Sequence, residues 1–121
     1  MNKHTATDFL RLACAGRVHD AFERHVTKGF RHHNAWFPSD GKSLARGMEE
    51  NARQNPGKTC DVKQAVEEGD RVVLYSLVHH KPGDRGVAVV HIFRFEDGRI
   101  AELWDLAQEI PENMANELGM F

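Results

Sequence analysis

The sequence predicts an α+β fold in which helices come first and an antiparallel sheet follows. Up to about residue 57, apolar side chains recur at helical spacing. Residues 59–108 instead hold four runs rich in β-branched and aromatic residues, separated by the turn signals EEGD, KPGDRG and EDG. Helices followed by consecutive strands is the order in which helices collect on one face of an antiparallel sheet.

The first two helices are predicted to form a hairpin. Thr5 or Thr7 can cap the first helix, which ends at Gly16, and the second helix follows and ends before Gly29. Both carry their apolar residues on one face, so we expect the pair to pack against a common core.

A third helix is expected after the irregular stretch FRHHNAWFPSDG at 30–41. Ser39 or Asp40 can start it, and Asn55-Pro56-Gly57 ends it. Strands are then predicted at about 59–67, 71–80, 86–96 and 99–108, joined as an antiparallel meander.

Composition limits the class of protein. A chain of 121 residues has the size of one domain, so we expect a single domain over residues 1–121. A formal net charge of -2 without a basic run argues against nucleic acid as a partner. No apolar stretch reaches the ~20 residues that cross a bilayer, and MNKHTATDF lacks a signal-peptide core. We therefore expect no membrane contact and a cytoplasmic address.

The two cysteines, Cys14 and Cys60, sit in unrelated contexts without CxxC spacing, so we interpret both as reduced packing residues. The eight histidines show no HxxxH or HExxH spacing. Neighbouring strand residues point in opposite directions, so His32-His33 and His79-His80 each supply one ligand at most. A metal site built from His33, His79, His91 and Asp105 is geometrically conceivable, but we expect neither metal nor cofactor.

Asp105 is a lone carboxylate in an otherwise apolar strand, and the preceding turn decides where it points. A two-residue turn of Asp97 and Gly98 would place His91 and Asp105 on opposite faces of the sheet. A three-residue turn at 96–98, with Gly98 left-handed in a G1 bulge, would place both on one face as diagonal neighbours roughly 7–8 Å apart.

We predict the longer turn, which pairs Phe95 with Arg99, His91 with Leu103 and Val89 with Asp105. It gathers apolar side chains on one wall and polar ones on the other: Phe93, Phe95, Ala101 and Leu103 against Arg94, Glu96 and Glu102. Trp104 then faces away from the site, where exposed aromatic surface favours a homodimer interface.

A carboxylate in an apolar wall is disfavoured in its charged form, so the pKa of Asp105 should rise and Asp105 should become a stronger base. His91 beside it can donate to an oxygen on which negative charge develops, as enolisation requires. The alternative from residue types alone is that Asp105 is a structural ion-pair partner and His91 a hydrogen-bonded core histidine.

Further candidates lie on two segments. Trp36 and Phe37 lie in the irregular stretch. Their side chains either lie at the mouth of a pocket or are buried in the core. Tyr75 and His79 share one face of their strand, and Ser76, Val78 and His80 share the other. If the first face points inward, Tyr75 and His79 can hydrogen-bond a substrate oxygen, and otherwise they are solvated.

The run IFRFEDGRIAELWDLAQ, preceded by HHNAWFPSDG and a helical hairpin, resembles the SnoaL-like polyketide cyclases of the nuclear transport factor 2-like superfamily. The resemblance covers nearly the full chain, and DGRIAELWD is its most specific part. It implies an α+β cone, a curved antiparallel sheet wrapped around helices to leave a deep pocket. It also implies ring closure by aldol condensation without metal or cofactor, with Asp105 as general acid/base, His91 fourteen residues upstream assisting, and His33 and Asn34 lining the pocket.

Together these points predict a cofactor-free enzyme acting on a small hydrophobic carbonyl ligand by aldol condensation or cyclisation, isomerisation or dehydration through an enolate. Asp105 and His91 are the predicted catalytic residues. The predicted substrate-binding residues are His33, Asn34, Trp36, Tyr75 and His79. The alternative is a non-catalytic small-molecule-binding module of the same fold, since a fold does not decide function.

Overall fold

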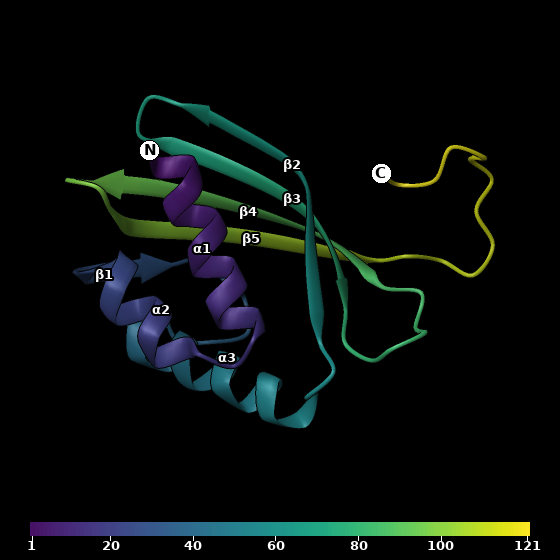
Figure 1. Cartoon of the computed structure of the whole chain (residues 1–121), viewed down its shortest axis with the longest axis horizontal. Helices are drawn as coiled ribbons and strands as arrows, with labels where there is room; N and C mark the ends of the chain where they lie inside the picture. The colour runs from purple at the N-terminus through teal and green to yellow at the C-terminus, as the bar shows by residue number, and fades with distance from the viewer.

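Three helices lie on one face of a curved five-stranded sheet in a computed structural model that describes residues 1–121 (Figure 1). The strand order is β1-β5-β4-β3-β2, with β1 parallel to β5 and the other neighbours antiparallel. The elements are α1 (Asn2–Cys14), α2 (Val18–His25), β1 (Val26–His32), α3 (Gly41–Gln54), β2 (Thr59–Glu68), β3 (Arg71–His79), β4 (Val87–Glu96) and β5 (Arg99–Glu109). The predicted α+β cone is confirmed, and the four predicted strands match β2 to β5 to within one residue.

The N-terminal part differs from the prediction at two points. α1 begins at Asn2, so neither Thr5 nor Thr7 caps it, and the Thr7 hydroxyl donates to the Lys3 carbonyl inside the helix at 2.8 Å. The second helix was predicted to run on towards Gly29, which is wrong, because α2 ends at His25 and β1 begins directly. The edge of β5 supplies a parallel hydrogen-bonding partner that no local pattern reveals.

α3 begins and ends where the sequence predicts. Asp40 is its N-cap, and its carboxylate accepts a hydrogen bond from the Ser43 backbone N–H at 2.9 Å. The helix ends at Gln54, just before Asn55-Pro56-Gly57. None of the three helices is long and apolar enough to cross a membrane.

The core lies between the helices and the concave face of the sheet. Its aromatic rings meet edge to face: Phe9 lies 5.3 Å from Phe22 and 6.0 Å from Phe93, and Phe22 lies 5.7 Å from Phe30. Phe9, Phe30 and Phe93 are fully buried. Such pairs contribute about 0.5–1.5 kcal/mol each beyond their buried area, so they lock α1 and α2 onto the sheet.

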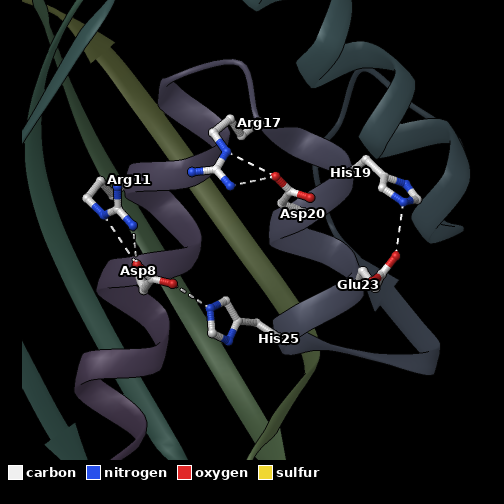
Figure 2. Close-up of polar contacts among 7 residues, drawn as sticks. All are labelled: Asp8, Arg11, Arg17, His19, Asp20, Glu23 and His25. Atoms are coloured by element: carbon white, nitrogen blue, oxygen red, sulfur yellow. Dashed lines mark hydrogen bonds and ion pairs between the residues drawn. The ribbon is translucent and has the colours of Figure 1, made fainter.

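Asp8 joins α1 to the end of α2 (Figure 2). Its carboxylate contacts Arg11 Nη2 at 2.7 Å and His25 Nε2 at 2.7 Å. The two other ion pairs in the figure involve residues of α2 or the residue before it and are solvent-exposed: Arg17–Asp20 and His19–Glu23. The bridge at Asp8 is therefore the polar link between the two helices.

Cys14 and Cys60 form a disulfide, so the prediction that both are reduced is wrong. Their Cα atoms lie 6.2 Å apart although 46 residues separate them in the chain. Packing of the end of α1 against β2 brings them together, and the missing CxxC spacing carries no information about such long-range proximity. The bond fixes the end of α1 to the start of β2.

The turn between β4 and β5 has two residues, so the predicted three-residue turn and its register are wrong. Asp97 and Gly98 both have positive φ, 49° and 77°, and Glu96 pairs with Arg99. This is the type I′ geometry that an Asp-Gly pair favours. A β-bulge at Ala101 then shifts the register by one residue, and His91 pairs directly with Asp105.

Although the predicted register is wrong, the bulge still places His91 and Asp105 on the same face of the sheet, as predicted. His91 and Asp105 share a face, and the predicted apolar wall is buried there: Phe93, Phe95, Ala101 and Leu103. Ile100 and Ala101 are adjacent in the chain yet both buried, which is the local signature of the bulge.

Candidate functional site

A cavity of about 260 Å³ lies between α1, α3 and the concave face of the sheet. Its apolar wall comes largely from the helices and from β3 and β4, and includes Leu10, Phe37, Leu44, Met48, Val78 and Val89. Its polar groups come from six different elements or loops: Asn34, Asn51, Lys58, His80, His91 and Asp105. A small, mostly apolar hollow with a few convergent polar groups is the usual form of a small-molecule site.

Asp105 is held at the point where β1 stops covering β5. The last pair of these strands is His32 with Leu103, and the His33 backbone N–H donates to the Leu103 carbonyl at 2.9 Å. Beyond it, Asn34 Nδ2 donates to Asp105 Oδ2 at 3.1 Å. Asp105 forms no ion pair within 4.0 Å, so this amide is its one side-chain partner.

Asn34 is itself fixed by the loop. Its Oδ1 accepts from the Trp36 backbone N–H at 2.9 Å, and its own backbone N–H donates to His32 Nδ1 at 3.1 Å. His32 is buried, and its Nε2 donates to the Pro38 carbonyl at 2.5 Å. A ring that donates at Nε2 and accepts at Nδ1 is the neutral imidazole. His32, which the sequence did not single out, thus holds the loop that aims Asn34 at Asp105.

His91 lies directly opposite Asp105 and is 7% exposed. Its ring stacks on Phe93 with 5.9 Å between centroids, and Nδ1 is buried without a hydrogen-bond partner. Burial lowers the pKa of His91 to about 4; the charge of Asp105 opposes this shift and that of Lys58 adds to it. His91 is therefore neutral near pH 7 and can donate one N–H without carrying charge.

Lys58 and His80 also line the cavity, and sequence reasoning gave neither a role. Lys58 Nζ donates to Asn51 Oδ1 at 2.7 Å, and burial lowers the pKa of the Lys58 ammonium. Burial, followed by the charge of Lys58, lowers the pKa of His80. The only local signal for Lys58 is its place just after the Asn55-Pro56-Gly57 break, where the chain turns back to start β2.

Three of the predicted substrate-binding residues lie on the convex face of the sheet, away from the cavity. His33 Nε2 contacts Glu102 Oε2 at 2.7 Å, and its ring stacks on Trp104 at 4.9 Å. Tyr75 and His79 alternate with the buried Leu74, Ser76 and Val78, and so face outward.

Tyr75 and His79 contact other residues of the chain on the convex face. The Tyr75 hydroxyl donates to the Met120 carbonyl at 2.5 Å, and its ring stacks on Phe121. His79 Nδ1 contacts the carboxylate of Asp84 at 2.7 Å. The alternation of the strand was correctly predicted, and the inward face is the one that holds Ser76, Val78 and His80.

Trp36 and Phe37 differ from each other. Trp36 is 86% exposed, so it is no core plug, whereas Phe37 lines the cavity. Phe37 packs so closely on Gly47 of α3 that a Cβ there would lie 2.4 Å from the ring. Of the predicted substrate-binding residues, Asn34 is the one that lines the cavity with His91 and Asp105.

The structure does not bring together three or more His, Cys, Asp or Glu side chains in an arrangement that could hold a metal ion. Of the conceivable set His33, His79, His91 and Asp105, the first two lie on the opposite face of the sheet from His91.

The chain belongs to the SnoaL-like family, because the model of the SnoaL-like domain matches residues 6–103. The matched region includes His91 and ends two residues before Asp105. No curated protein matches the chain.

Solved structures share the fold at low sequence identity. One proposed to be a polyketide cyclase, from Bacillus cereus ATCC 10987, is 21% identical with a TM-score of 0.75, over 87% of this chain and 72% of that one. IdmH from Streptomyces antibioticus, also proposed to be a polyketide cyclase, is 18% identical with a TM-score of 0.74, over 89% and 92%. An NTF2-like protein of unknown function from Cytophaga hutchinsonii is 16% identical with a TM-score of 0.71, over 89% and 90%. These likenesses establish an NTF2-like fold.

Proposed function

We propose that the chain is a cofactor-free acid/base enzyme that acts on a small carbonyl compound through an enolate. The observation that carries the proposal is the pairing of Asp105 with a neutral His91 in the wall of one small cavity. The polyketide cyclase descriptions of two structural neighbours are consistent with this chemistry.

In this mechanism, Asp105 removes a proton from the carbon next to the carbonyl. Asn34 holds one carboxylate oxygen, which leaves the other oxygen to approach the C–H bond. A ring N–H of His91 donates to the carbonyl oxygen as negative charge develops on it. A neutral imidazole suits this role, because it stabilises the enolate without first giving up its own proton. The enolate then leads to aldol closure, isomerisation or dehydration.

The non-catalytic binding module remains the rival proposal. It predicts that Asp105 is engaged in a structural ion pair or that side chains fill the cavity. Asp105 has only Asn34 as a side-chain partner, and about 260 Å³ next to it is open. Both observations favour the enzyme over the binding module.

The test is exchange of α-protons for deuterium in a panel of small ketones and 1,3-dicarbonyl compounds, followed by proton NMR in D₂O. We expect Asp105→Asn to slow protein-dependent exchange by roughly 10²-fold or more, since general-base catalysis contributes about 10²–10⁴-fold. Asp61→Asn is the matched control, because Asp61 is an exposed β2 residue outside the cavity. A folded Asp105→Asn protein that exchanges at the wild-type rate would contradict the mechanism.

We also propose that the chain forms a homodimer through the convex face of the sheet. Val90, Ile92, Trp104 and Leu106 line a shallow groove on that face, and Leu106 is 77% exposed. Apolar surface gathered on one sheet face is typical of an interaction site.

A cytoplasmic address stays a prediction. The Cys14–Cys60 bond bears on it, because cytosolic reductants keep most thiols reduced. A thiol titration of protein extracted under alkylating conditions measures the state of that pair in the cell.

A further inference from the structure

The cavity contains a cation with no ionic partner. Lys58 forms no ion pair within 4.0 Å, and its one side-chain partner is the amide oxygen of Asn51. An ammonium group carries three N–H donors, so two remain after this hydrogen bond. A half-buried charge beside apolar walls is costly unless a partner of opposite charge joins it.

No group of the protein around Lys58 is free to serve as its anionic partner, so a ligand can take that position. Burial lowers the pKa of the His80 and His91 imidazoles, and the charge of the nearby Lys58 lowers the pKa of both further. Asp105 is the one carboxylate among the cavity-lining residues, and Asn34 already holds it. Nδ1 of the buried His91 also lacks a partner. The Lys58 ammonium thus presents two N–H donors to the cavity that no protein acceptor satisfies.

Building on the proposed function, we propose that Lys58 determines the specificity of this site and that the substrate is a small carbonyl compound carrying a carboxylate. Lys58 binds the carboxylate, while Asp105 and His91 act on the carbon next to the carbonyl. One ammonium matches one carboxylate charge. A phosphate dianion is disfavoured, because phosphate sites use several cationic or backbone donors and Asp105 would repel the second charge.

The size of the cavity limits the rest of the substrate. At about 260 Å³ it falls just below the usual range for ligand pockets, about 300–1,000 Å³. The lining of the cavity also includes apolar residues of α1 and α3: Leu10, Leu44 and Met48. A ligand with one carboxylate, one ketone and a compact apolar end fits both features.

The test compares 4-oxo-4-phenylbutanoate with its neutral amide, 4-oxo-4-phenylbutanamide, by NMR titration near neutral pH. We expect wild-type protein to bind the acid at least about tenfold more tightly, as a charge-assisted hydrogen bond to a desolvated ammonium implies. Lys58→Met should remove this preference while amide affinity stays within about threefold. Lys58→Gln removes the charge but keeps an N–H donor for Asn51. If the Met variant does not fold, the Gln variant shows whether the preference for the acid depends on the charge of Lys58.

Lys28→Met is the matched control, because Lys28 is exposed on β1 and should leave the preference unchanged. Three results would each overturn the proposal: equal binding of acid and amide by wild-type protein, an acid preference that persists in Lys58→Met, and no binding of the acid at millimolar concentration.

The Asp105→Asn variant separates this proposal from the catalytic one. That variant should bind the acid at least as tightly as wild type, whether or not Asp105 is the base.

Discussion

The buried imidazole of His91 couples the stability of the fold to pH. In the unfolded chain its pKa is near the ordinary 6.5, whereas burial lowers it to about 4 in the folded protein. Between these values the unfolded state binds a proton that the folded state does not. Stability from this group is complete above pH 6.5 and is lost as pH falls towards 4.

We therefore expect His91→Gln to flatten the acid side of the stability profile. At 1.36 kcal/mol per pKa unit, the full loss in wild-type protein is about 3 kcal/mol. Urea unfolding at several pH values between neutral and about 4.5 follows the larger part of this loss. His19→Gln, at an exposed site on α2, should keep the wild-type slope. Parallel pH profiles for His91→Gln and wild type would contradict this assignment.

At the residue scale, the sequence predicted the site only where chemistry contrasts with local pattern. Asp105 stands out because a carboxylate interrupts an apolar strand. The shared face of His91 and Asp105 was predicted from a register that the structure does not have, and the bulge at Ala101 produces it instead. Lys58 follows a loop that looks solvent-exposed, and only tertiary packing places it in the cavity. Tyr75 and His79 show the limit of periodicity, since alternation separates two faces without telling which one is concave.

At the scale of elements, Asp8 links α1 to α2 (Figure 2). Its hydrogen bonds to His25 and then to Arg11 lower the pKa of the Asp8 carboxyl. Stability from Asp8 is thus present above its ordinary pKa of 3.8 and lost as pH falls below it. The Asp8 side chain is 32% exposed, so solvent screening limits the effect.

Asp8→Asn should lower the free energy of unfolding by about 1 kcal/mol, because it weakens both contacts at a partly buried position. The exposed pair at Asp20 provides the comparison, and Asp20→Asn should change stability by less than about 0.5 kcal/mol. Urea unfolding near neutral pH gives both numbers. Equal effects of the two substitutions would show that the link between the helices adds nothing beyond a surface ion pair.

The elements that the sequence predicted well are those whose signals are local. Asp40 caps α3, Asn55 follows its end, and the turn residues bound β2 to β5. β1 was missed because seven residues with few apolar positions become a strand only beside β5. The disulfide was missed for the same reason, since its two cysteines meet only through packing of α1 on β2.

At the scale of the whole molecule, the convex face of the sheet is only partly covered by the chain itself. Phe121 stacks on Tyr75, and His33 stacks on Trp104 with the Arg71 guanidinium 5.5 Å from the indole. Leu106 stays exposed beside them. A second copy of the chain is the occupant that the proposed homodimer places there.

Light scattering after size exclusion should give twice the 13.7 kDa chain mass at micromolar concentration. Leu106→Glu should shift the protein towards one chain, because it places a charge in the apolar groove. Val66→Glu is the matched control, since Val66 is 58% exposed on β2 and lies outside the groove. A single-chain mass for wild-type protein would refute the dimer.

The bulge at Ala101 makes the site depend on the number of residues in the chain as well as on their identity. Inserting one residue between Gly98 and Leu103 without a second bulge would shift the pairing by one position and turn every later β5 side chain to the other face. Trp104 would then pair with His91 and face the hollow, and the carboxylate of Asp105 would turn to the convex face. Among relatives, one extra residue in this short segment would thus mark a change of chemistry more surely than most substitutions around it.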